Sequence, residues 1–93
     1  MEFSALEWDE NKRLRNIEKH GLDFLDAIAV LDGPCLVRSA REVASEVRSM
    51  VIGRLDDIVV CIIFTMRESV LRVISMRKAR NEERRHYEEV FGG

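Results

Sequence analysis

Residues 70–87 read VLRVISMRKARNEERRHY and predict a β-strand that runs directly into an α-helix. Strand side chains alternate between two faces, so we expect Arg72, Ile74 and Met76 on one face and Leu71, Val73 and Ser75 on the other. A cation in line with apolar side chains requires an anion or an opening to water. Residues 67–85 carry seven basic and three acidic side chains, net +4, in a chain of net charge −2. The rest of the chain is therefore interpreted as a scaffold that presents this basic segment.

The length and composition predict one small cytoplasmic domain spanning residues 1–93. Hydrophobic residues make up 46% and charged residues 34%, as in ordinary globular proteins. No run approaches the roughly 20 apolar residues of a membrane span, and the first residues do not resemble a signal peptide. Cys35 and Cys61 are isolated, so we expect reduced thiols. No metal or cofactor is predicted.

The N-terminal third predicts a short strand at residues 3–8 and two helices. Asp9 is a candidate N-cap for a helix over about residues 10–19, which Gly21 would end. Asp23 is a second candidate N-cap. It begins a short amphipathic helix whose apolar stripe is Phe24, Ile28 and Leu31, and which ends at Asp32-Gly33-Pro34.

The remainder predicts strands at residues 47–53, 58–65 and 70–76, with a weaker candidate at residues 35–41. Asp56 and Asp57 form the polar pair of a hairpin turn, and Asn81 is a candidate N-cap for the last helix. The strands cluster instead of alternating with helices. This order favours an α+β fold with a small, mostly antiparallel sheet of three to five strands, two N-terminal helices and one C-terminal helix.

Three arginines could act together on this sheet. If the strands are antiparallel neighbours, Arg48 and Arg72 lie on flanking strands and Arg67 lies in the loop at one end. Arginine binds phosphate bidentately and stays charged. When a ribose 2′-hydroxyl cleaves RNA, fixed cations stabilise the charge on the phosphorane oxygens without a metal. The alternative is that these arginines form surface ion pairs with Asp or Glu.

Other candidate groups have plainer structural explanations. His20 suits acid–base chemistry, although its position also fits helix C-capping. Tyr87 could donate a hydrogen bond to phosphate or simply pack. Glu83 is expected to pair with Arg80 or Arg84 more than to act as a base. The remaining groups are expected in plain roles: exposed lysines at Lys12 and Lys19, a core thiol at Cys61 and a solvated ring at His86.

Several segments together resemble the BrnT-type toxins of type II toxin–antitoxin pairs, which are RelE-like in fold. The resemblance rests on Glu7-Trp8-Asp9, Lys12, Asn16, Lys19-His20-Gly21, Phe24, Asp32, Pro34, Arg48, Ile52-Gly53, Thr65, Arg67, residues 72–79, Glu83-Arg84 and Tyr87. Each motif is weak, but the set is specific and covers nearly the whole chain in the right order.

The resemblance implies metal-independent ribonuclease activity through 2′-hydroxyl attack, which inhibits translation and growth. It implies a cognate antitoxin, usually a ribbon-helix-helix (BrnA-like) protein, through which DNA is contacted, and it allows a toxin homodimer within the complex. By motif position, it assigns phosphate stabilisation to Arg48, Arg67, Arg72 and Arg77, and acid–base chemistry to His20. RNA contact would fall to Lys12, Lys19, Lys78 and Tyr87.

This sequence departs from the family pattern at three places. Gly33 replaces one residue of an acidic pair, Arg80 replaces the Ser or Thr expected to cap the last helix, and Val47 replaces a Glu before Arg48. The last departure leaves Arg48 without an expected neighbouring carboxylate. Two other hypotheses stay open beside the ribonuclease. In one, the chain is a catalytically weak interaction module that mainly binds its antitoxin; in the other, it is a structural or regulatory α+β protein.

Overall fold

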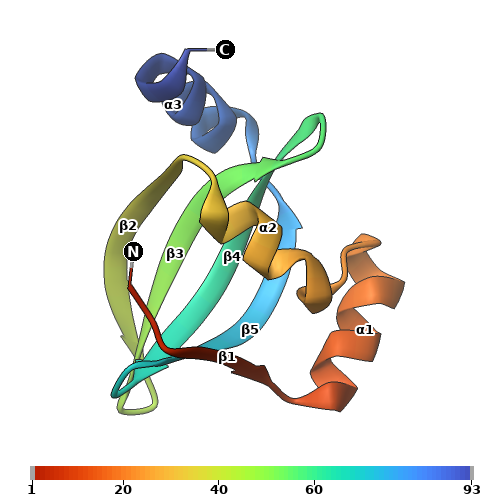
Figure 1. Cartoon of the computed structure of the whole chain (residues 1–93), viewed down its shortest axis with the longest axis vertical. Helices are drawn as coiled ribbons and strands as arrows, with labels where there is room; N and C mark the ends of the chain where they lie inside the picture. The colour runs from red at the N-terminus through yellow and green to blue at the C-terminus, as the bar shows by residue number, and fades with distance from the viewer. Residues whose placement is uncertain (1, 93) are drawn as a thin grey trace.

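The computed structural model describes residues 2–92, which form one five-stranded sheet with helices on both faces (Figure 1). The strands are β1 (Ala5–Trp8), β2 (Cys35–Val43), β3 (Glu46–Leu55), β4 (Ile58–Arg67) and β5 (Val70–Lys78). The helices are α1 (Glu10–His20), α2 (Ala27–Asp32) and α3 (Asn81–Phe91), and a 3-10 turn, η1 (Phe24–Asp26), precedes α2. The strand order is β1-β5-β4-β3-β2, in which only the β1–β5 pair is parallel. The predicted α+β fold is confirmed.

Helix α1 begins and ends as predicted. The Asp9 side chain accepts a hydrogen bond from the Lys12 backbone N–H at 3.1 Å. Gly21 adopts a left-handed φ of 68°, and its N–H donates to the Ile17 carbonyl at 2.8 Å. The Asp9 and Gly21 predictions are therefore confirmed.

The predicted apolar stripe of the second helix is wrong in one member. Asp23 caps η1 as expected, accepting from the Leu25 backbone N–H at 2.9 Å. The fully buried residues are Phe24, Ala27 and Val30, whereas Ile28 is 46% exposed. A 3-10 turn has about three residues per turn. The residue three positions after Phe24, Ala27, therefore faces the core, and Ile28, four positions after it, does not.

The two faces of the sheet are covered unequally. α1, η1 and α2 cover one face over a core that includes Phe24, Val51, Ile62 and Leu71. On the other face, α3 lies beyond one end of the sheet (Figure 1), and there Tyr87 packs with Ile52, Val59 and Cys61. The prediction that Cys61 is a core residue is confirmed.

Strand β5 contains a bulge that changes the predicted alternation. Its register to β4 pairs Ser75 with Ile63 but Val73 with Phe64, so Ile74 is an extra residue. Leu71, Val73 and Met76 all lie in the core as a result. The predicted grouping of Arg72 with Met76 is therefore wrong, because the bulge reverses the two faces beyond Val73.

The Asn16 side chain takes the place of a neighbouring strand beside this bulge. Its amide nitrogen donates to the carbonyls of Leu22 at 2.9 Å and Met76 at 2.8 Å, and its oxygen accepts from the Met76 N–H at 3.1 Å. Asn16 is 6% exposed. It thus attaches α1 to β5 beyond the end of β1, where the backbone of Met76 would otherwise lack a partner.

We expect Asn16→Ala to lower the free energy of unfolding by about 2–3 kcal/mol, because it leaves buried backbone groups of Leu22 and Met76 unsatisfied. Urea unfolding followed by circular dichroism measures the change. Asn11→Ala, on the exposed side of α1, is the matched control and should stay within about 0.5 kcal/mol of wild type. Equal effects of the two substitutions would contradict the role given to Asn16.

Candidate phosphate-binding site

The cross-strand register gathers arginines on the sheet face that carries α3. Arg41 lies opposite Arg48 in the β2–β3 pair, and Arg72 lies opposite Thr65 in the β4–β5 pair. Thr65 Oγ1 donates to the Val47 carbonyl at 2.8 Å, which ties β4 to β3 at this level. Arg48 and Arg72 therefore share one face, two strand spacings or about 10 Å apart. This arrangement agrees with the convergence of Arg48 and Arg72 expected from the sequence. The expectation that Arg67 lies in the loop is wrong, because β4 runs two residues beyond Thr65 and pairs Arg67 with Val70.

Arg41, Arg48 and Arg72 form a row across the strands. Next to this row, the same face holds a pocket of about 380 Å³, here called the arginine pocket. Four arginines contribute to its wall, together with small and apolar side chains. The lining residues are Arg41, Val43, Arg48, Ser49, Met50, Ile63, Arg77 and Arg80. The bulge is the reason that Arg77 reaches this face. Arg77 pairs with Cys61 and Arg72 pairs with Thr65, and these two β4 residues are four apart and so share a face. Five residues of unbroken strand would have placed Arg72 and Arg77 on opposite faces.

The arginines of the row are engaged by carboxylates. Arg72 Nη1 lies 2.8 Å from Glu7, which is its partner on β1. Glu46 receives Arg48 Nε at 3.0 Å and lies 3.7 Å from Arg67 Nη2. The hydrogen bond from Arg48 is the main cause that lowers the pKa of Glu46. The expectation that Arg48 lacks a neighbouring carboxylate is wrong, because Glu46 lies two residues before it and projects to the same face.

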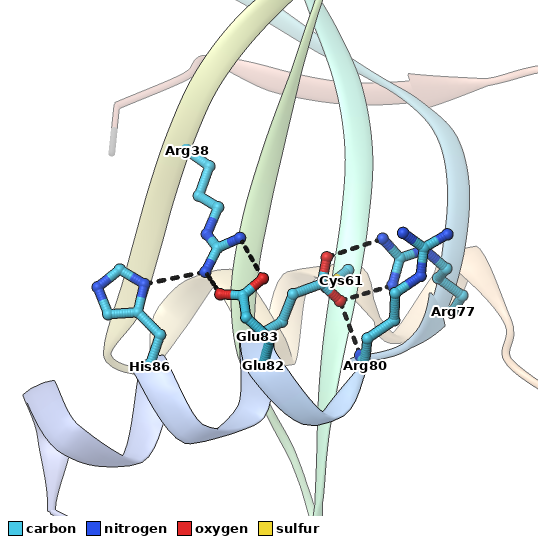
Figure 2. A network of polar contacts seen from close by, with 7 residues as sticks. All are labelled: Arg38, Cys61, Arg77, Arg80, Glu82, Glu83 and His86. Carbon is cyan, nitrogen blue, oxygen red and sulfur yellow. Dashed lines mark hydrogen bonds and ion pairs between the residues drawn. The ribbon is translucent and has the colours of Figure 1, made fainter.

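Glu83 is the centre of a buried polar network that joins α3 to β5 (Figure 2). Its two oxygens receive Arg77 Nη1 at 2.8 Å and Nη2 at 3.0 Å, the bidentate geometry of a strong ion pair. It also accepts from the Arg80 backbone N–H at 2.7 Å and the Cys61 thiol at 3.3 Å. The predicted guanidinium partners are therefore wrong: Arg80 contributes its backbone, and Arg84 pairs with Glu88 at 3.2 Å.

The Glu83 network changes the pKa of two side chains, Glu83 and Cys61. The Arg77 hydrogen bonds are the largest cause that lowers the pKa of Glu83 from 4.5 to about 2. Burial, followed by the nearby Glu83, raises the pKa of Cys61 from 9.0 to about 12. Glu83 is thus ionised and Cys61 is a protonated thiol at neutral pH, so neither is suited to exchange protons there.

The start of α3 differs from the prediction by one residue. Arg80 is the N-cap, with extended backbone, and Asn81 is the first helical residue. Glu83 supplies the reciprocal half of a capping box, because its carboxylate accepts a hydrogen bond from the Arg80 N–H. Outside the pocket, Arg38 contacts Glu82 and donates to His86 Nδ1 at 3.0 Å (Figure 2). His86 is exposed, as predicted, but takes part in this network.

The other predicted site residues lie in three further places. His20, Lys12 and Lys19 line a hollow of about 160 Å³ between α1 and β5, with Arg15, Asn16, Ile74 and Ser75. Lys78 lies in a separate hollow with Arg54 and Arg84. Tyr87 is 2% exposed, and its hydroxyl donates to the Pro34 carbonyl at 3.0 Å. The structure thus places Arg48 and Arg77 in one pocket, with Arg72 and Arg67 on the same sheet nearby, and His20 elsewhere.

Sequence reasoning missed three residues of the site. Arg41 and Arg80 line the pocket, and Glu46 bridges Arg48 and Arg67. Glu46 and Arg48 share an i, i+2 spacing that could have shown their common face. Arg41 required the register of the β2–β3 hairpin, and Arg80 required the docking of α3.

Within residues 2–92, no group of three or more His, Cys, Asp or Glu side chains could hold a metal ion. None of the described helices is both long and apolar enough to cross a membrane.

These features define a small α+β protein with a cluster of arginines on one sheet face. The chain matches the family model of the ribonuclease toxin BrnT of type II toxin–antitoxin systems over residues 8–83. It is similar to the crystal structure of the Brucella abortus ribonuclease toxin BrnT, at 37% identity and a TM-score of 0.62, over 83% of this chain and 97% of that one. Comparison with curated proteins gives no match. The chain belongs to the BrnT family of toxins.

We expect Glu83→Gln to destabilise the fold in a pH-dependent manner. Because folding lowers the pKa of Glu83 to about 2, its contribution is fully present above the ordinary pKa of 4.5 and is lost as pH falls towards 2. The shift corresponds to on the order of 3 kcal/mol. Urea unfolding at several pH values should show a deficit at pH 7 that shrinks below pH ~4. Glu89→Gln, on the exposed side of α3, is the control, and a deficit independent of pH would contradict the assignment.

Proposed function

We propose that this protein is an endoribonuclease toxin that cleaves RNA without a metal ion, through attack by the ribose 2′-hydroxyl. The observation that carries the proposal is the arginine pocket, in which Arg41, Arg48, Arg77 and Arg80 surround a space of about 380 Å³. Guanidinium groups from three strands and one helix cap can bind the scissile phosphate and stabilise charge on the phosphorane. Membership of a ribonuclease toxin family supports the same reaction.

The members of the arginine cluster have different roles in this proposal. Glu83 fixes Arg77 by two hydrogen bonds, so its guanidinium is a rigid part of the wall. Arg48 and Arg67 share the single carboxylate Glu46 and can exchange it for phosphate. Arg72 is held by Glu7 at the level of Arg48 and contacts the RNA backbone on the β5 side.

The hollow beside α1 extends the binding surface in this proposal. Ser75 lines that hollow, and its register partner Ile63 lines the arginine pocket, so the two hollows are separated by one pair of neighbouring residues on β5 and β4. Lys12 and Lys19 then contact flanking phosphates, and His20 serves as an acid–base group for a nucleotide that crosses the bulge. Tyr87 and Lys78 take no part, because Tyr87 is buried and Lys78 lies in a different hollow.

In the cell, this cleavage removes translatable RNA from the cytoplasm and thereby arrests growth. Membership of a type II family implies an antitoxin partner. We propose that this partner is a ribbon-helix-helix protein, which makes the DNA contacts of the complex.

A second candidate function is favoured by the ion pairs on the same face. Arg48, Arg72 and Arg77 are each bound to a carboxylate, which is the arrangement of a surface whose charge is already compensated. In this alternative, the chain is a catalytically weak module that exchanges these partners for acidic residues of the antitoxin. Expression without the antitoxin is then harmless, whereas a nuclease stops growth and degrades RNA.

We expect Arg48→Ala and Arg72→Ala each to lower the rate of RNA cleavage by about 10²-fold or more, because the first removes a cation beside the phosphorane and the second removes a cation that positions the RNA backbone against the sheet. Arg48→Lys should restore only part of the rate, since an ammonium group cannot bind phosphate bidentately. Gel assays with purified protein and a transcribed RNA, in the presence of a chelator, measure the rates.

Arg85→Ala is the matched control, because Arg85 is exposed on α3 and lies outside the pocket. It removes the same charge and should cleave like the wild type. Cleavage unchanged in both Arg48→Ala and Arg72→Ala would remove the proposed mechanism.

A further inference from the structure

We propose that Glu46 is the general base that takes the proton of the attacking 2′-hydroxyl. The inference rests on the proposed function and adds the proton acceptor that the arginine pocket lacks. Of the residues that line the pocket, four are arginines, which stay protonated, and the others are Ser49 and apolar side chains. The acceptor must therefore come from a side chain next to this lining, and His20 lies apart from it, in the hollow between α1 and β5.

Three carboxylates contact the arginines that line the arginine pocket or lie in the row beside it, and geometry separates them. Glu83 is 3% exposed and both of its oxygens are occupied by Arg77, so it is closed to substrate. Glu7 is bound to Arg72, which does not line the pocket. Glu46 is bound to Arg48, which does line it, and keeps 30% of its side chain exposed. Glu46 is the carboxylate of the three that is both open and next to the pocket.

The contacts of Glu46 differ between its two oxygens. Oε1 accepts a hydrogen bond from Arg48 Nε at 3.0 Å. Oε2 has a longer contact, 3.7 Å to Arg67 Nη2. A phosphate that binds these guanidinium groups would replace the carboxylate as their partner. Because those contacts lower the pKa of Glu46, their loss returns the pKa towards its ordinary value and makes the carboxylate a stronger base beside the bound nucleotide.

The proposed step is balanced without a further reagent. The Glu46 carboxylate accepts the 2′-hydroxyl proton as the 2′-oxygen forms its bond to phosphorus. The bond from phosphorus to the 5′-oxygen breaks, its electron pair leaves with that oxygen, and the oxygen takes a proton from water or an acid group. The products are a 2′,3′-cyclic phosphate and a 5′-hydroxyl, and the proton on Glu46 returns to solvent.

The test compares wild type, Glu46→Gln, Glu46→Asp and the control Glu42→Gln, which removes the same charge from the adjacent strand. Cleavage sites on a transcribed RNA are mapped first, and a short RNA containing one site is then used for rates. Binding is measured with the same oligonucleotide carrying a 2′-deoxy residue at the site, which cannot react. Rates are followed from pH 6 to pH 9.

We expect Glu46→Gln to lose about 10²-fold or more in cleavage rate with binding retained, and Glu46→Asp to lose less. The groups that face Glu46 are Arg48 and Arg67, with Arg41 opposite Arg48, and all remain charged over this range. The wild-type rate should therefore be level with pH, whereas the Glu46→Gln rate should rise about tenfold per pH unit, because hydroxide must remove the proton.

Two results would overturn the inference. Cleavage by Glu46→Gln at the wild-type rate or faster would show that Glu46 only occupies the arginines until phosphate arrives. Loss of cleavage and binding together would assign Glu46 to holding the site. If the wild type itself does not cleave RNA, the proposed function falls first, so the two failures are distinguishable.

Discussion

The extra residue in β5 is the constraint on which the basic face depends. Arg72 and Arg77 are five residues apart and would project to opposite faces of a regular strand. The bulge at Ile74 turns both towards the same face, while Leu71, Val73 and Met76 remain in the core. One inserted residue thus serves two requirements, a continuous apolar core on one side and converging cations on the other.

The bulge must itself be supported, because it lies where β1 has ended and β4 is the one strand left beside β5. Asn16 supports one side, pairing with both backbone groups of Met76 as a strand would. Glu83 supports the other, binding Arg77 and the Arg80 N–H at once. The position of Arg77 is therefore set by α1 behind the sheet and by α3 in front of it.

The elements of this fold were largely predictable from the sequence, whereas their faces were not. Asp9, Gly21, Asp23 and the Asp56-Asp57 turn act locally, through hydrogen bonds within a few residues, so their signals are present in the sequence itself. The bulge at Ile74 and the 3-10 turn at Phe24 change periodicity by a single residue, and no local signal marked either. Arg48 and Arg72 were predicted as site residues, but Arg41, Arg80 and Glu46 depend on the register and helix docking that bring distant segments together.

The β2–β3 hairpin shows why the site is expensive to build. Its turn residues Ala44 and Ser45 adopt positive φ values of 50° and 65°, which non-glycine residues rarely do. The tight turn fixes a register that sets Arg41 directly opposite Arg48, and like charges across a pair of strands repel. Neither feature helps the core. Together they bring Glu46 next to Arg48 and set Arg41 and Arg48 in the wall of the arginine pocket, where an anionic ligand would relieve the repulsion between the two guanidinium groups.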